Sequence, residues 1–513
     1  MTDQLMAHNR KVLDLDALAV RLKELKQEGR TIVLAHGVFD LMHLGHIRHF
    51  QHAKGMGDIL IVTLTPDKYV NKGPHRPAFN QELRAEALSA LDCVDYVAIN
   101  NWPTAIETIH HLSPDLYVKG SDYKDRSNDA TGNINLEEEA VRKVGGEIVF
   151  TDDITFSSSN LINMHLSVLP PEVHDFIRDF GSSYSAADIV RCLDDAAKLR
   201  VLIVGEAIID EYQYCETMGK SGKEPILAAR YLSGERFAGG ALATANNVAA
   251  FSDHVGLLTF LGEIDSHEEF IRKTLNKKIE PFFLKMKDAP TIVKRRFVEL
   301  YPFQKLFEVY VMSSSEDDEA QQQDLCASLE SLLPKYDVVI VTDYGHGMLG
   351  PRAVEVLSEH SKFLAINTQV NSENRGFNTI SRYRSADYIC VSENEIRLEA
   401  RSRNRPLEDI LPEISKRLEC KRMLITCGER GCFGFSQDHG FFQVPAFTGK
   451  VVDRVGAGDS VFAVTSLCVA QGAPMEMVGL IGNAVGAQAV ATVGNREPIE
   501  RVSLLKYLES LLK

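Results

Sequence analysis

Short apolar runs alternate with segments of helical pattern along most of this 513-residue chain. The strand-like runs are 31–39, 58–66, 95–100, 338–345, 362–367, 387–392 and 422–428. Strands that alternate with helices form parallel sheets that are covered by helices on both faces. The sequence therefore predicts an α/β protein.

The alternation is interrupted between residues 167 and 198, where polar helical segments replace the strand pattern. A chain of this length corresponds to about three ordinary domains or two large ones. We predict a first domain over 1–166, a linker over 167–198 and a larger second domain over 199–513.

The chain is acidic, with 56 Lys and Arg against 71 Asp and Glu. Such a chain is a poor nonspecific ligand for nucleic acid or an anionic membrane, so we expect neither partner. Nine cysteines without a CxxC pair favour reduced thiols in a cytoplasmic protein. We find no apolar run long enough to span a membrane.

The first strand-like run ends in HGVFD at 36–40, and His43-Leu44-Gly45-His46 follows at the start of a helical pattern. Histidines three residues apart in a first helical turn face the same side. A helix N-terminus favours phosphate, and imidazole donors can stabilise charge that develops on phosphorus under attack. Alone, the pair fits helix caps equally well, and it lacks the spacing and glutamate of a zinc protease.

Residues 31–165 resemble the cytidylyltransferase-like nucleotidyltransferase superfamily, which is marked by HxGH after a GxFD strand end. Arg76-Pro77, Arg84, VKGSDY at 118–123 and SSSN at 157–160 extend the resemblance. The nearest likeness is the adenylyltransferase half of bifunctional heptose kinase/adenylyltransferases. Glycerol-3-phosphate cytidylyltransferases are more distant.

The resemblance implies a Rossmann-like domain that moves a nucleotidyl group from ATP or CTP to a sugar phosphate and releases pyrophosphate. His43 and His46 would be catalytic. The residues implied in nucleotide and phosphate binding are Gly37, Phe39, Asp40, Lys72, Arg84, Lys119, Ser157, Ser158 and Ser159. The serines fit an ordinary helix cap as well, and Lys119 fits a charge at a strand end.

The segment VVDRVGAGDSVFA at 451–463 predicts a helix that opens at Gly456-Ala457-Gly458 and carries Asp459 in its first turn. Small residues allow the helix amides to approach a phosphate. A carboxylate there can accept the proton of a hydroxyl nucleophile during phosphoryl transfer. In isolation, the tetrapeptide GAGD fits an ordinary helix start.

Residues of about 199–511 resemble the ribokinase/phosphofructokinase-B superfamily of sugar kinases. The resemblance depends on GEAIID at 205–210, FAGGALATANNVA at 237–249, TDYGHGML at 342–349, TCGERG at 426–431 and GAGD. It implies a ribokinase-like domain with a small β lid formed around 212–236 and 291–311, which often mediates dimerisation in relatives. The two halves of the heptose enzyme stand here in reversed order.

By this resemblance Asp459 is the catalytic base, and Mg2+ accompanies ATP without direct protein ligands that we can name. The sugar-pocket residues are Asp210, Gly239, Gly240 and Asn246. The nucleotide- and anion-binding residues are Asn394, Thr426, Gly428, Gly456, Ala457, Gly458 and Asn483. Asp343 touches substrate or simply ends a strand.

Two departures from the kinase pattern stand out. The family usually has an Asn-x-x-Glu pattern, and when it is aligned on Asn394 no glutamate follows at the required spacing. Arg454 stands where the family often has a small hydroxyl residue. We expect bifunctional synthesis of a nucleotide-activated sugar of ADP-heptose type by a homodimer that takes sugar phosphates and nucleotides. The alternative is a cytidylyltransferase for a polyol or another sugar phosphate whose kinase-like domain only senses a ligand or dimerises.

Overall fold

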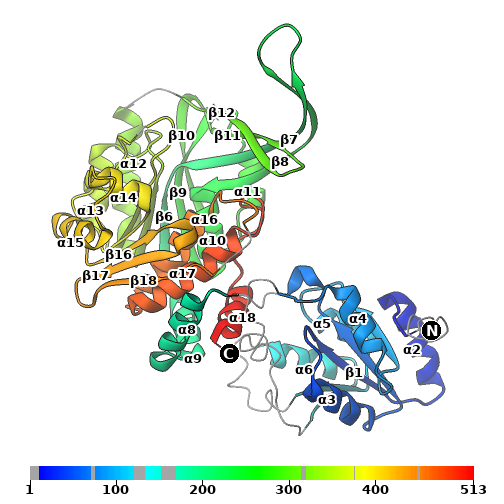
Figure 1. Ribbon diagram of the computed structural model, residues 1–513. Coiled ribbons are helices and arrows are strands. Elements are labelled where there is room, and N and C mark those ends of the chain that lie inside the picture. The colour runs from blue at the N-terminus through cyan, green and yellow to red at the C-terminus, as the bar shows by residue number, and fades with distance from the viewer. Residues whose placement is uncertain are drawn as a thin grey trace. The chain divides into compact units, whose positions relative to one another are not determined.

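The computed structural model describes residues 11–70, 76–120, 133–151, 169–313, 319–374, 376–447 and 451–512. The chain separates into two compact units, Met1–Pro170 with Leu505–Lys513, and Pro171–Leu504. Both units contain parallel sheets with helices, which confirms the predicted α/β class (Figure 1). None of the described helices is long and apolar enough to cross a membrane.

The first unit is built on a parallel sheet of order β3-β2-β1-β4-β5. Its elements are α2 (Leu15–Gln27), β1 (Ile32–Gly37), α3 (Leu44–Lys54), β2 (Ile59–Leu64), α4 (Gln81–Ser89), β3 (Tyr96–Ile99), α5 (Ile106–Leu112), β4 (Leu116–Lys119), α6 (Asn133–Lys143) and β5 (Glu147–Phe150). Apolar cores lie on both faces of the sheet. The strand order reverses between β1 and β4, and ligands of open α/β sheets bind at such a point.

The second unit has a nine-stranded sheet of order β10-β9-β6-β13-β14-β15-β16-β17-β18, antiparallel only in its last two pairings. The strands are β6 (Arg200–Gly205), β9 (His254–Ile264), β10 (Ile279–Pro290), β13 (Val338–Asp343), β14 (Leu364–Thr368), β15 (Tyr388–Ser392), β16 (Arg422–Thr426), β17 (Cys432–Ser436) and β18 (Gly440–Val444). Helices α10 (Ala241–Ala249), α16 (Ala457–Ala470) and α17 (Met475–Ala489) cover one face (Figure 1). Helices α12 (Glu319–Leu332), α13 (Pro351–His360), α14 (Glu393–Glu399) and α15 (Leu407–Arg417) cover the other. The described residues also include α11 (Glu268–Thr274) and α18 (Arg501–Leu512).

A separate four-stranded sheet of order β12-β11-β7-β8 forms the expected lid. Its strands are β7 (Ala207–Lys220), β8 (Leu227–Gly240), β11 (Ile292–Glu299) and β12 (Gln304–Val311). The chain passes directly from β6 of the main sheet to β7 of the lid, with only Glu206 between the two strands. The β7–β8 hairpin projects well beyond the body of the unit (Figure 1).

The segment predicted to be a linker folds as helices α8 (Pro171–Ser183) and α9 (Ala186–Ala196). A capping box between Ser185 and Asp188 starts α9, and Ile189 and Leu193 are buried. Because α9 packs on α16, these helices are part of the second unit, with apolar contacts that a polar linker would not make.

Candidate active sites

The HxGH histidines of the first unit meet at the carboxyl end of β1. His43 is the N-cap of α3, and its Nδ1 accepts a hydrogen bond from the Gly45 amide at 3.1 Å. The rings of His43 and His46 are stacked with centroids 3.9 Å apart, and the ring of Phe39 meets His46 edge-on at 5.3 Å. Burial lowers the pKa of His43, so that its imidazole is neutral at physiological pH.

A tight turn after β1 brings these rings together. Phe39 adopts a φ of 48°, a conformation that is rare for a residue with a side chain. A Cβ on Gly37 would lie 2.9 Å from the Phe39 ring, so only glycine fits under it. The predicted roles of Gly37 and Phe39 in shaping the pocket are thus compatible with where the two residues lie.

Asp40 is buried and organises the next loop. Its carboxylate pairs with Arg76 at 2.8 Å and accepts the Ala78 amide at 2.6 Å. Both charged side chains are almost fully buried, so removing either would leave the other charge without compensation. Asp40 therefore holds Arg76 and the Ala78 amide in place, and its role in nucleotide binding stays a prediction.

Arg84 differs from its expected role. Its guanidinium is buried and donates to the carbonyls of Val38, Thr65 and Phe79 and to the carboxylate of Asp67. These contacts fasten the loops after β1 and β2 to α4. Because its donors are used inside the protein, this geometry gives no support to phosphate neutralisation by Arg84.

The remaining predicted residues of the first unit fall into two groups. Lys119 pairs with the buried Glu137 at 2.7 Å and lies over the ring of Tyr117. Lys72, Ser157, Ser158 and Ser159 lie outside the described residues. Sequence reasoning did not single out His36, whose ring bridges Thr63 at 2.9 Å and Thr65 at 3.3 Å. Burial lowers the pKa of His36 to about 3, so it is a neutral bridge between strands.

The second unit holds a cavity of about 340 Å³ between the lid strands and the carboxyl ends of the main sheet. The predicted residues that line it are Asp210, Gly240, Thr426, Gly456, Gly458 and Asp459. Arg454, one of the two departures from the kinase pattern, also lines it. The other lining residues are Ile208, Lys294, Arg296, Tyr344, Asn367, Gln369, Cys390, Val391, Ser392, Glu395 and Val455. We call this cavity the acceptor pocket.

Asp459 lies in the first turn of α16, directly after the GAGD glycines. Gly456 has a φ of 79°, and a Cβ there would overlap the Asn495 side chain. Burial raises the pKa of Asp459 to about 6, and a hydrogen bond from the Tyr344 hydroxyl at 2.8 Å opposes the rise. The carboxylate is therefore ionised at neutral pH yet basic enough to accept a proton.

The lid supplies the charged wall of the acceptor pocket. Asp210 of β7 pairs with the buried Arg296 of β11 and accepts from Asn495 at 3.3 Å. Lys294 of β11 is also buried, and burial lowers the pKa of its ammonium group. A Cβ on Gly239 would lie 2.4 Å from Asp210 Oδ2, so the glycine keeps room for this carboxylate.

The structure corrects the alignment of the Asn-x-x-Glu pattern. Ser392 is the N-cap of α14, and Glu395 completes a capping box with it while also accepting the Val370 amide at 3.3 Å. Glu395 lines the acceptor pocket, whereas Asn394 is exposed and is not part of the lining. The glutamate spacing is therefore kept from Ser392 to Glu395, with serine in place of asparagine.

Five other predicted residues do not line the acceptor pocket, and one of them is Gly239. Asn246 bridges Thr274 and Asn276, and the Asn483 amide donates to the Val444 carbonyl at 3.1 Å. Ala457 and Gly428 are likewise absent from the lining, the latter in a turn after β16. The asparagines have structural partners that the sequence pattern does not reveal.

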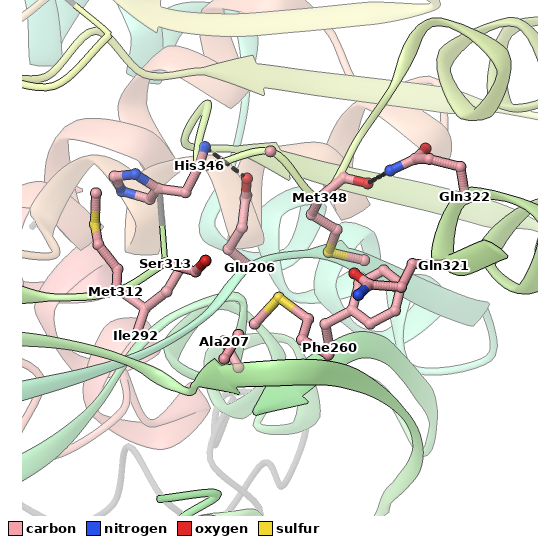
Figure 2. Close-up of a pocket in the computed structure, with 13 residues that line it drawn as sticks. Glu206, Ala207, Phe260, Ile292, Met312, Ser313, Gln321, Gln322, His346 and Met348 are labelled. Carbon is pink, nitrogen blue, oxygen red and sulfur yellow. Dashed lines mark hydrogen bonds between the residues drawn. The ribbon is translucent and has the colours of Figure 1, made fainter. Parts of the chain in front are cut away.

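A second, smaller cavity of about 40 Å³ lies at the base of the lid, where Figure 2 shows Glu206 beneath the loop that follows β13. The two Glu206 oxygens accept the amides of Tyr344 and His346, each at 3.1 Å. Burial and the nearby Asp343 raise the pKa of Glu206 to about 7. Asp343 itself accepts from Tyr383 at 2.9 Å and does not line the acceptor pocket.

Comparison with known proteins finds one family model for each unit. The model of the pfkB family carbohydrate kinases matches residues 198–501, and that of the cytidylyltransferase-like family matches 34–164. Bifunctional protein HldE of Citrifermentans bemidjiense is 43% identical over 115 residues, 22% of this chain and 24% of that protein. Its counterpart in Geotalea uraniireducens is 38% identical over 158 residues, 30% of each chain.

The aligned regions thus span only about a quarter to a third of these relatives' length. A mutant of phosphofructokinase-2 from Escherichia coli superposes with a TM-score of 0.50 at 14% identity. The alignment covers 60% of this chain and 99% of that protein, and it shows a shared fold.

Proposed function

Because this chain belongs to the pfkB family of carbohydrate kinases, we propose that its second unit transfers the γ-phosphoryl group of ATP to a hydroxyl of a sugar or sugar phosphate. The observation that carries the proposal is the position of Asp459 in the acceptor pocket, at the start of a helix opened by small residues. That arrangement places a base and an anion-binding helix terminus side by side.

The acceptor oxygen attacks the γ-phosphorus while its proton passes to the carboxylate of Asp459. One oxygen–phosphorus bond forms, and the bond to the leaving oxygen of ADP breaks. The backbone amides at Gly456–Gly458 stabilise the charge on the transferred group. Glu395, a hard oxygen donor in the acceptor pocket, is suited to hold Mg2+ through its water shell, and this ion would neutralise the ATP phosphates.

For the first unit we propose nucleotidyl transfer from a nucleoside triphosphate to a sugar phosphate, with release of pyrophosphate. The stacked His43 and His46 at the start of α3 support this role, because their ring N–H groups can donate to the triphosphate in the transition state. The acceptor is a phosphate that is already anionic, so no general base is needed. The likeness to the HldE proteins favours ATP over CTP.

Together the two units would make a nucleotide-activated sugar of ADP-heptose type. The alternative is a kinase-like unit that only senses a ligand or dimerises. The loss of the family's glutamate spacing was an argument for it, and Glu395 three residues after Ser392 removes that argument. The buried, ionisable Asp459 favours turnover over mere binding.

The test uses the full-length protein with Mg2+, each of the four nucleoside triphosphates and a panel of heptose, heptose phosphates and polyol phosphates. ADP and pyrophosphate are measured separately, and product masses identify the acceptors. We expect ADP with a heptose or its phosphate, and pyrophosphate with ATP and heptose 1-phosphate. Pyrophosphate with CTP alone would move the first unit to CDP-linked chemistry, and no ADP with any sugar would contradict the kinase proposal.

We also propose that the protein is a homodimer joined through the lid. The outer half of the β7–β8 hairpin exposes an apolar set, namely Met218, Ile226, Leu227, Tyr231 and Leu232. Exposed apolar clusters of this kind typically mark a protein interface. Light scattering on Ile226→Asp should then give a monomer, and a dimer of unchanged strength would contradict the proposal.

A further inference from the structure

Tyr344 links the end of β13 to the proposed kinase base. Its hydroxyl donates to Asp459 Oδ1 at 2.8 Å, and among the described residues no other hydrogen bond reaches the Asp459 side chain. Tyr344 is 3% exposed, so water does not compete for this bond. The contact joins residues that are 115 positions apart in the sequence.

The backbone of Tyr344 is fixed on both sides. Its amide donates to Glu206 Oε2 at 3.1 Å, while its carbonyl accepts from Asn371 at 2.7 Å and Asn374 at 3.1 Å. Glu206 also holds the amide of His346, as Figure 2 shows. The phenol therefore reaches Asp459 from a loop whose backbone is held by three side chains.

Several charged groups around Asp459 influence the pKa of its carboxyl group together with the Tyr344 hydroxyl. The carboxylates of Asp210 and Glu395 raise the pKa of Asp459, in addition to burial, while Lys294 and Tyr344 lower it. Among these groups Tyr344 is the neutral hydrogen-bond donor, and its hydroxyl stabilises the ionised carboxylate of Asp459.

We propose that Tyr344 is a positioning residue of the phosphoryl transfer, held by Glu206, that fixes Asp459 through Oδ1 and leaves Oδ2 for the proton of the acceptor hydroxyl. The inference rests on the proposed kinase function of the same pocket. It adds a residue that sets the orientation and protonation of the group that receives the proton.

The test compares wild type and Tyr344→Phe in the full-length chain, with ATP and heptose 7-phosphate as the acceptor probe. A hydrogen bond to a charged group is worth about a tenfold to hundredfold change, so kcat at pH 7 should fall by that factor while KM for ATP stays the same. The acid limb of kcat/KM should move upward by about one pH unit, since the carboxylate loses its donor. An unmoved limb would overturn the proposal.

Tyr388→Phe is the matched control, because Tyr388 is fully buried under α16 and donates to Thr465 at 2.9 Å instead of to Asp459. It should lower stability without moving the acid limb. If this variant moved the limb by the same amount, the effect would belong to packing around α16 and the positioning role would be refuted.

A second measurement separates this proposal from the proposed function. The pKa of Asp459 is obtained without turnover, from the difference in unfolding free energy between each protein and its Asp459→Asn variant as a function of pH. The ionised, buried carboxylate costs stability, so the contribution of Asp459 to the unfolding free energy falls as pH rises from the unfolded-state pKa, about 4, and becomes constant above the folded-state pKa. We expect the curve to level off near pH 6 in wild type and at a higher pH in Tyr344→Phe. Curves that level off at the same pH would refute the role of Tyr344 even in a protein without kinase turnover.

Discussion

The two candidate sites of this chain bring together different kinds of side chains. The acceptor pocket gathers carboxylates and buried cations, among them Asp210, Arg296 and Asp459. At the start of α3 the principal groups are two stacked imidazoles, and the nearby Asp40 is occupied by Arg76 and a loop amide. The difference follows from the acceptor that each site is proposed to take: a hydroxyl must lose its proton to attack, whereas a phosphate already carries deprotonated oxygens at neutral pH.

The strongest test of this contrast is Asp459→Asn. Removing a general base lowers kcat by about 10²- to 10⁴-fold, and the amide preserves the shape of the side chain. We expect that loss in ADP formation, while pyrophosphate release in the same sample stays unchanged. ADP formation at the wild-type rate would show that the base lies elsewhere.

His46→Ala is the reciprocal experiment. Loss of one donor to a charged transition state costs about 10²- to 10³-fold, so pyrophosphate release should fall by that factor. Phosphorylation of the sugar should continue at the wild-type rate. A parallel loss in both assays would instead indicate damage to the whole chain, which circular dichroism can detect.

Glu395→Gln and Asn394→Ala test the corrected alignment. Outer partners of a metal or its ligands contribute about ten- to a hundredfold, and we expect a loss of that size in kcat for Glu395→Gln. Asn394 is exposed, so its replacement by alanine should leave kcat unchanged. The opposite ranking would restore the alignment on Asn394.

The pH dependence of the two reactions should also differ, and this is the smallest of the expected effects. With the pKa of Asp459 near 6, kcat/KM for phosphorylation should be flat above pH 7 and fall about tenfold per unit below pH 6, as the base becomes protonated. Nucleotidyl transfer should show no limb from this carboxylate. Both activities are measured as a function of pH on one preparation. A fall in both activities below pH 6 would contradict the assignment of the base to the kinase reaction alone.

The sequence predicted the site of the first unit better than that of the second. HxGH and GxFD lie within eleven consecutive residues, so the local pattern already carried the geometry around His43 and His46. For the acceptor pocket, the sequence indicated only the ends of strands and the glycine-containing starts of helices. Lys294 and Tyr344 come from lid and loop segments that only the folded sheet brings to Asp459.

Long polar side chains are where the sequence said least about local contacts. Arg84 has the charge for a phosphate ligand, but its direction is set by the carbonyls that surround it. Asn246 and Asn483 stand in motif-like segments, yet Asn246 bridges two backbone groups, and Asn483 donates to the Val444 carbonyl and to the Cys432 sulfur. Sequence patterns specify where a residue lies on an element, whereas hydrogen-bond partners from distant loops decide what its side chain does.

The two consecutive glycines at the end of β8, Gly239 and Gly240, limit which codon changes the gene can accept. A Cβ on Gly239 would meet Asp210, and one on Gly240 would lie 2.6 Å from the Glu206 carbonyl. Every missense change in a glycine codon adds at least that carbon. A variant library of this protein should therefore return few accepted replacements at these two neighbouring codons, and fewest at Gly240, because the oxygen it would meet belongs to the backbone.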